Sequence, residues 1–293
     1  MIMKPSKILI LVGGKSLLVF VQLFKNILGS VALLLWATLT HAAPQKIVSL
    51  NLCTDQLLML LADPNQIASL SKIVDDPYVS LLAMKSKNFK KNLGDAEQIF
   101  MESPDLVVAG VYTEKATVQM LKSLGVRVEI FPIEQNFEDI LKNIRKMGDL
   151  VGHSDRAKIM IDDFNQRLAE LQSGINLRPR AALYSANGYT TGAETMAGRI
   201  LSAAGFKNIT EEIGLSYGGV LPLETLVIMQ PDIVVSGEAY PGHSRAEEIL
   251  QHPALRPLKT VTQTDAKWVC GTPAVLDAIS ELQRAHPDKG KKQ

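Results

Sequence analysis

One phrase of this sequence occurs twice. It reads EQIFMESPDLVVAG at residues 97–110 and ETLVIMQPDIVVSG at residues 224–237. Each copy predicts a short helix, a turn at the Pro-Asp pair and a buried strand ending at a glycine, because short apolar runs bounded by turn residues are typical of strands in parallel sheets. Such internal similarity indicates two copies of one architectural unit. The alternative is that a generic helix–turn–strand phrase arises twice by chance.

A single helix is predicted between the two copies, over residues 154–173. Ser154 is a suitable N-cap, and Asp155 lies in the first turn, where a carboxylate suits the helix dipole. Gly174 and Pro179 end the helix. Twenty residues span roughly 30 Å, about the width of a small domain. One face is apolar at three- and four-residue spacing: Ala157, Ile161, Phe164, Leu168 and Leu171.

Predicted strands alternate with predicted helices on both sides of this helix, which favours mostly parallel βα units. The predicted fold class is therefore α/β, with two Rossmann-like α/β lobes joined by a single long backbone helix. The predicted boundaries are 1–42 for a signal peptide, 43–152 for the N-terminal lobe, 153–177 for the linking helix, 178–286 for the C-terminal lobe and 287–293 for a disordered tail.

The first 42 residues have the pattern of a secretory signal peptide. Lys4, Lys7, Lys15 and Lys25 precede an apolar stretch at residues 27–39, and small residues flank His41 before the expected cleavage site. No cysteine follows that site, so a lipid anchor is not expected. A retained membrane anchor is the alternative. We expect a mature protein free in an extracytoplasmic compartment, most simply a periplasm.

Composition argues against several classes of function. The net charge is only +1 and aromatic residues are 5% of the 293, so no nucleic acid or other polyanion is expected as a partner. The 5 histidines form no HEXXH motif, and no GxSxG elbow, P-loop or dinucleotide fingerprint is present. We therefore expect no catalytic residues, no metal site and no cofactor.

The phrases and their order resemble the helical-backbone class of periplasmic substrate-binding proteins of ABC importers, the group that carries cobalamin, ferric siderophores or haem. The resemblance covers residues 44–285, essentially the whole mature chain. It is carried by residues 46–51 (KIVSLN), 94–110, 190–209 (TTGAETMAGRILSAAGFKNI) and 223–237, together with the single linking helix. The resemblance implies a ligand cleft between two lobes and a rigid linking helix. Because a continuous helix resists bending more than extended strands would, we expect the lobes to close by only a few degrees on ligand binding.

The resemblance also predicts which residues contact the ligand. It implies that a metal chelate or tetrapyrrole contacts cleft loops, where tyrosine supplies both an apolar face and a hydroxyl. The cobalamin-binding members have several tryptophans there, whereas Gly110, Asn92 and Lys91 occupy the matching N-terminal loops of this chain. The expected ligand-binding residues are Asn51, Tyr112, Tyr189, Tyr217 and Trp268.

Docking onto the permease dimer in the inner membrane is implied for Glu97 and Glu224. In the family, one exposed glutamate on each lobe meets arginines of the permease, and these two begin the duplicated phrases. Each also opens a predicted helix, where the dipole favours a carboxylate. The alternative is that both are simply good first-turn residues.

Cys53 and Cys270 are the only cysteines. By resemblance both lie near the cleft, one in each lobe. A disulfide between them, two free thiols, and contact with a ligand or metal remain alternatives; in an oxidising compartment a pair often forms a disulfide.

The leading hypothesis is a periplasmic substrate-binding protein that captures an iron chelate, haem or corrinoid and delivers it to an ABC importer. One alternative is a cobalamin-specific binding protein. Another is an extracytoplasmic chelate-processing enzyme on the same fold, and a third is a structural or adhesion module.

Overall fold

The computed structural model describes residues 43–173, 178–237, 242 and 244–285, and residues 43–293 form one compact unit. The predicted signal peptide, the helix stop at Gly174 and the predicted tail at residues 287–293 lie outside the described residues. No helix in the described ranges is long and apolar enough to cross a membrane.

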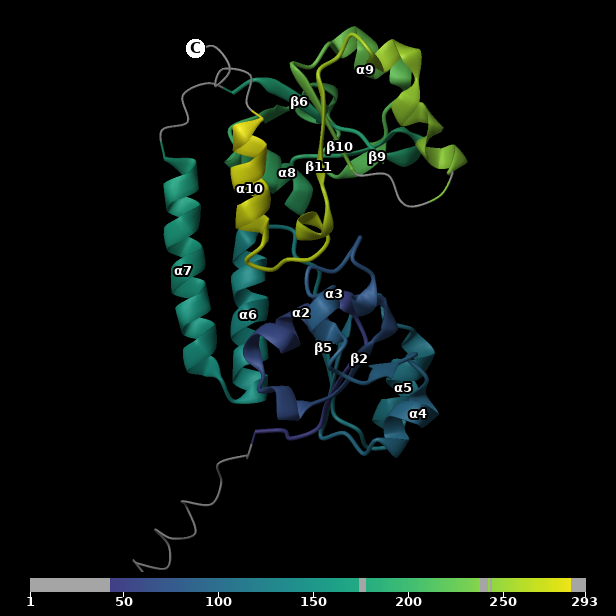
Figure 1. The fold of residues 1–293 in the computed structure, drawn as a ribbon, viewed down its shortest axis with the longest axis vertical. Coiled ribbons are helices and arrows are strands. Elements are labelled where there is room, and N and C mark those ends of the chain that lie inside the picture. Colours follow the sequence, from purple (N-terminus) through teal and green to yellow (C-terminus); the bar gives the residue numbers. More distant parts are fainter. Residues whose placement is uncertain (1–42, 174–177, 238–241, 243, 286–293) are drawn as a thin grey trace, which may run out of the picture. The chain divides into compact units, whose positions relative to one another are not determined.

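The N-terminal lobe is built on a five-stranded sheet in the order β3-β2-β1-β4-β5, and every neighbouring pair is parallel. Its strands are β1 (Ile47–Ser49), β2 (Ile67–Ser71), β3 (Lys91–Asn92), β4 (Leu106–Gly110) and β5 (Val128–Phe131). Its helices are α2 (Leu52–Leu61), α3 (Ala83–Ser86), α4 (Ala96–Met101), α5 (Lys115–Ser123) and α6 (Phe137–Val151). The predicted alternation of strands and helices is confirmed, and Figure 1 shows helices on both sides of this sheet.

The central strands β1 and β4 are buried on both faces, which explains the continuous apolar run of β4, whereas the edge strands β3 and β5 contain polar residues. Successive side chains of a strand point to opposite faces. Ile47 of β1 packs in a core with residues of α2 and α6, while Val48 packs with Ile99 of α4 and Leu121 of α5. A one-residue shift of β1 would exchange the two faces but would leave an apolar side chain on each.

The C-terminal lobe has a four-stranded parallel sheet in the order β11-β10-β6-β8. Its strands are β6 (Arg180–Leu183), β8 (Lys207–Asn208), β10 (Ile233–Gly237) and β11 (Thr260–Thr264). A separate antiparallel pair, β7 (Tyr189–Thr191) and β9 (Gly218–Val220), stands beside it. The helices are α8 (Met196–Ala203), α9 (Leu223–Met229) and α10 (Val275–Arg284). The predicted fold class of two α/β lobes is confirmed (Figure 1).

The duplicated phrase folds the same way in both lobes. The Asp105 carboxylate accepts from the backbone N–H of Lys46 at 3.0 Å, and the Asp105 N–H donates to the Lys46 carbonyl at 2.9 Å. Asp232 makes the same reciprocal pair with Arg180, at 2.7 and 2.9 Å. Each aspartate thus aligns its own strand with the start of the neighbouring strand, β1 or β6.

The turn before each aspartate is also duplicated. Ser103 and Gln230 both have positive φ, 49° and 46°, and each precedes the proline of its phrase. A left-handed residue ends the helix, and proline prevents the helix from resuming. The common backbone path explains why the same residue types recur at these offsets.

The linking helix is α7, Ser154–Gln172. Its predicted apolar face is confirmed: Ala157, Ile161 and Phe164 are buried, and Leu168 and Leu171 pack against the same core. The predicted cap at Ser154 is wrong. His153 occupies the N-cap position without a side-chain cap bond, and the Ser154 hydroxyl donates to Asp149 at 2.6 Å instead.

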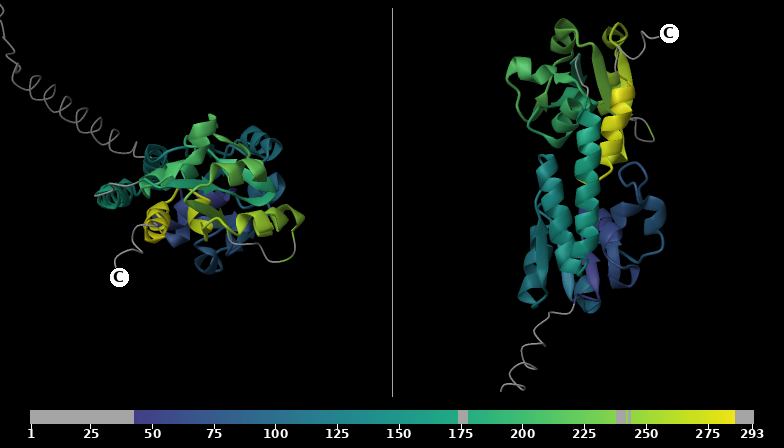
Figure 2. Two further views of the ribbon diagram at one scale, coloured as in Figure 1. Left: turned by 90° about the horizontal axis from the view of Figure 1, so that it is seen from above. Right: turned by 90° about the vertical axis from the view of Figure 1, so that its left-hand side faces the viewer.

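Helix α7 packs along α6 at its N-terminal part and along α10 further on (Figures 1 and 2). Gly152 turns the chain between α6 and α7 with φ 81°, and Gly148 lets the two helices approach, since a Cβ there would lie 2.3 Å from that of Ala157. At the other end, the Arg167 guanidinium donates to the Asp277 carboxylate of α10 at 2.7 Å. The link therefore has one neighbouring helix from each lobe.

Candidate functional site

A cavity of about 310 Å³ lies between loops of the two lobes. The N-terminal lobe contributes residues 133–135, which follow β5, and the C-terminal lobe contributes residues 194–197, Tyr217 and the segment around Trp268. The loops after β5 and β11 lie beyond the carboxyl ends of parallel strands, where open α/β sheets bind ligands. The complete lining is Ile133, Glu134, Gln135, Glu194, Thr195, Met196, Ala197, Tyr217, Trp268, Val269 and Gly271. We call this space the interlobe cavity.

Two of the five predicted ligand-binding residues line the interlobe cavity. Tyr217 is 62% exposed and precedes β9, and Trp268 is half-buried at the end of a 3₁₀ turn, Ala266–Trp268. These side chains, together with Met196, give the cavity an apolar wall on the C-terminal lobe.

The other three predicted residues lie outside that lining. Asn51 caps α2, because its side-chain oxygen accepts from the Cys53 N–H at 2.9 Å, and its amide packs 3.0 Å from where a Cβ of Gly110 would stand. Tyr112, which follows β4, is 84% exposed. Tyr189 lies against Gly218 across the β7–β9 pair. The side-chain oxygen of Asn51 therefore has a structural role as the cap of α2.

Glu134 is a cavity residue that the sequence reasoning missed. Its carboxylate accepts from the Asn143 side-chain amide of α6 at 2.5 Å, and its Cγ lies 2.5 Å from where a Cβ of Gly271 in the other lobe would stand. Burial raises its pKa, and the Asn143 amide and the Gly271 backbone N–H oppose that shift only in part. The sequence does carry a signal for it, because Glu134 is a polar residue shortly after a predicted strand. The carboxyl ends of parallel strands form the edge of the sheet where ligand sites occur.

Glu194 is the second carboxyl group of the cavity. It lies just before Thr195, the N-cap of α8, and forms an ion pair with Arg199 of that helix. No lysine or arginine belongs to the lining formed by the described residues. The cavity wall therefore carries acceptors and apolar groups rather than cations.

Cys53 and Cys270 form a disulfide in the structure, with their Cα atoms 5.2 Å apart. Cys53 belongs to the first turn of α2 in the N-terminal lobe, and Cys270 lies between cavity residues Val269 and Gly271. The cysteines could have formed a disulfide, remained two free thiols, or contacted a ligand or metal, and the structure contains the disulfide. It connects the two lobes at the margin of the interlobe cavity.

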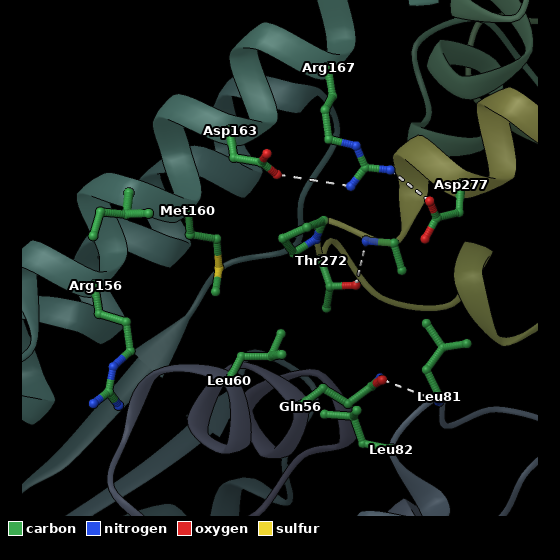
Figure 3. A pocket seen from close by; sticks show the side chains of 13 residues that line it. Gln56, Leu60, Leu81, Leu82, Arg156, Met160, Asp163, Arg167, Thr272 and Asp277 are labelled. Atoms are coloured by element: carbon green, nitrogen blue, oxygen red, sulfur yellow. Dashed lines mark hydrogen bonds and ion pairs between the residues drawn. The ribbon is translucent and has the colours of Figure 1, made fainter.

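A second cavity, of about 500 Å³, lies among α2, α7 and the start of α10 (Figure 3). The loop that carries Cys270 contributes to both cavities: residues 272–274 line this one, whereas Gly271 lines the interlobe cavity. Its arginines are already paired, Arg156 with Asp63 at 3.1 Å and Arg167 with Asp277 at 2.7 Å. None of the predicted site residues lines it.

The two predicted docking residues occupy equivalent positions. Glu97 lies in the first turn of α4 and Glu224 in the first turn of α9, and both are exposed. Among the described residues neither carboxylate has an ion-pair partner within 4.0 Å. Both are therefore accessible to an external cation.

No cluster of three or more histidine, cysteine, aspartate or glutamate side chains that could hold a metal ion occurs in the described part of the chain. The candidate site is thus a cavity lined by aromatic, apolar and carboxyl side chains.

Solved structures with the same fold include a periplasmic heme-binding protein from Roseiflexus sp. RS-1, with a TM-score of 0.69, 18% identity, and coverage of 84% of this chain and 99% of that one. An ABC-type Fe³⁺-hydroxamate transport system protein from Saccharomonospora viridis has a TM-score of 0.63 and 21% identity, with coverage of 83% and 93%.

Among curated proteins, a cobalamin-binding protein of Halobacterium salinarum is 26% identical over 204 residues, which are 66% of this chain but only 54% of that relative. A vitamin B12-binding protein of Photorhabdus laumondii is 24% identical over 286 residues, covering 94% of this chain and 96% of that protein. Residues 47–266 match the family model described as periplasmic binding protein, and the chain therefore belongs to the periplasmic binding protein family.

Proposed function

We propose that this protein captures a metal chelate or corrinoid in the interlobe cavity and delivers it to an ABC importer. The observation that carries the proposal is the cavity itself, which both lobes line and which contains Tyr217 and Trp268. Its volume of about 310 Å³ falls in the range of about 300–1,000 Å³ that is usual for small-molecule sites. Similar proteins whose names state a ligand bind cobalamin, heme or ferric hydroxamates.

The charge of the lining favours some of these ligands over others. Glu134 and Glu194 are its carboxyl groups, and the described lining contains no lysine or arginine. Haem carries two propionates, which would be placed near the Glu134 carboxyl group, and Arg199, the cation beside Glu194, is already paired with that glutamate; such an arrangement costs free energy. A neutral corrinoid or a cationic ferric hydroxamate meets no such penalty. We therefore favour a ligand without net negative charge.

A cobalamin-specific protein is the second candidate, and the names of the two curated relatives favour it. The small number of aromatic side chains in the cavity, Tyr217 and Trp268, supports the broader ligand class instead.

For delivery, we propose that Glu97 and Glu224 dock on the permease dimer in the inner membrane, and that residues 1–42 direct export to the periplasm. Both carboxylates are exposed, and both lie at the N-terminal ends of equivalent helices. Charge pairs at the edge of an interface guide encounter and orientation more than they add affinity.

Fluorescence of Trp268 tests the proposal, because it is the only tryptophan in residues 43–293. The protein is titrated with cyanocobalamin, ferrioxamine B and haem, and isothermal calorimetry confirms each affinity independently of light absorption by the ligand. We expect saturable binding of a corrinoid or hydroxamate chelate and weaker binding of haem. Absence of binding to all three would exclude the proposed function.

A further inference from the structure

Each lobe exposes one large apolar side chain at the same position of the duplicated phrase. Met101 is 83% exposed and lies four residues after Glu97, and Ile228 is 80% exposed and lies four residues after Glu224. Within the described part of the chain neither belongs to a hydrophobic core cluster or lines either cavity. The fold therefore has no evident use for these two side chains.

Helical geometry places each of them beside its glutamate. Residues four apart lie on the same face of a helix, one turn apart. The buried anchors of the two helices are Ile99 and Leu226, both fully buried and both two residues after the glutamate, so they mark the opposite face. Glu97 with Met101, and Glu224 with Ile228, thus form two outward-facing pairs. We call these pairs the docking patches.

A single exposed apolar residue is common on protein surfaces and needs no explanation. The duplication makes this case different. The Pro-Asp turn and the buried anchor recur at the same offsets because both copies use them to fold, as the hydrogen bonds of Asp105 and Asp232 demonstrate. The exposed apolar residue beside each glutamate, Met101 or Ile228, also recurs at the same offset, but it has no comparable role in folding.

We propose that the two docking patches contact the permease as units, with Met101 and Ile228 each entering an apolar depression beside the cation that receives the glutamate. This inference rests on the proposed function. The occupant is a two-fold symmetric membrane permease, because two equivalent patches on duplicated lobes match two equivalent sites on such a partner. The glutamates supply orientation, and the apolar side chains supply affinity through area removed from water.

The test uses the full mature chain and the ABC importer of the same organism whose ATPase the wild-type protein stimulates, purified in lipid nanodiscs. Met101→Gln is combined with Ile228→Gln, and binding and ATPase stimulation are measured at low and high salt. The matched control combines Met84→Gln with Ile159→Gln, an equally apolar pair that is 75% and 69% exposed and lies elsewhere. A fourth protein carries Glu97→Ala with Glu224→Ala.

We expect the Met101/Ile228 variant to bind the importer roughly tenfold or more weakly, with ligand affinity and folding unchanged. Its defect should persist at high salt, because salt screens charge pairs but does not weaken apolar burial. The control pair should behave as wild type. Wild-type binding and stimulation by the Met101/Ile228 variant, with a defect in the glutamate variant, would overturn this inference and leave the proposed function intact. Failure of the wild-type protein to stimulate any importer of the organism would overturn both.

Discussion

Gly271 of the C-terminal lobe lies so close to Glu134 of the N-terminal lobe that a Cβ on the glycine would stand 2.5 Å from the Glu134 Cγ. The contact also has an electrostatic part, because burial raises the pKa of the Glu134 carboxyl group and the Gly271 backbone N–H opposes that shift. With the disulfide at the preceding residue, Cys270, it holds the loop that carries Trp268 against the N-terminal lobe. The interlobe cavity is therefore bounded by a loop that is attached to both lobes.

Gly271→Ala should disturb this contact. The added methyl group must displace either the loop or the Glu134 side chain, and overpacking of this kind typically costs about 1–3 kcal/mol of unfolding free energy. Denaturant unfolding followed by Trp268 fluorescence measures the loss. Because Glu134→Ala removes the two nearest of the three clashing atoms, Cγ at 2.5 Å and Cδ at 2.7 Å, and leaves only Cβ at 2.9 Å, Gly271→Ala should cost less in that background. Equal costs in the two backgrounds would contradict the contact.

Removal of the disulfide should destabilise the protein. A bond between residues 217 positions apart restricts the unfolded chain strongly, and native disulfides typically contribute about 2–5 kcal/mol, although the mechanism is model-dependent. We expect Cys53→Ala combined with Cys270→Ala to unfold at lower denaturant concentration. A reductant should reduce the stability of the wild-type protein but not that of the variant. Mass spectrometry that found two free thiols in the untreated protein would refute the bond.

Asp55 should make stability depend on pH. This carboxyl is fully buried in α2 and accepts from the Ser71 N–H at 3.1 Å, and burial raises its pKa to about 7 from an ordinary value of 3.8. The folded protein therefore holds a proton between those pH values that the unfolded chain releases, so its contribution to stability falls as pH rises through this window. The slope is at most about 1.4 kcal/mol per pH unit.

Asp55→Asn should reduce that slope, because the amide keeps the shape of the neutral acid and does not ionise. Denaturant unfolding at pH 4.5, 6 and 8 compares the variant with wild type and with Asp155→Asn, an exposed aspartate of α7. Parallel profiles for the wild type and the Asp55 variant would show that the carboxyl does not carry a proton in this range.

Tyr217→Ala and Trp268→Ala should each weaken ligand binding by roughly tenfold or more, since aromatic residues in a cavity commonly provide much of the binding energy. Ile159→Ala serves as the control because it lines the other cavity. Isothermal calorimetry with the ligand found by titration gives the affinities. A loss confined to the Ile159 variant would place the ligand among α2, α7 and α10 instead.

Glu97→Ala combined with Glu224→Ala should leave ligand affinity intact and abolish stimulation of the importer ATPase, with each single change costing less than the pair. Glu138→Ala with Glu211→Ala is the matched control, since both are exposed first-turn glutamates and one lies in each lobe. Normal transport by the Glu97/Glu224 variant would exclude the docking role.

The lobes and the linking helix could be predicted from the sequence because they depend on local pattern. The apolar runs of β4 and β10, the Pro-Asp turns and the apolar face of α7 all involve residues close together in the chain. The cap at Ser154 was the local error, because α7 already includes Ser154 and its N-cap position falls on His153, one residue earlier than predicted. The predicted lobe boundaries and ligand-binding residues remain predictions.

Tertiary structure alone decided which residues meet at the candidate site. Glu134 and Gly271 are far apart in the chain and come together only through the packing of the lobes. Whether Cys53 and Cys270 form a disulfide depends on the distance between their Cα atoms, which cannot be read from their positions in the sequence. Asn51 is the opposite case: it was predicted to contact the ligand, and the structure shows that its side chain caps α2 and packs beside Gly110. Local periodicity determined the elements of this protein, whereas contacts between distant residues determined its cavity, because such contacts depend on how the finished elements pack.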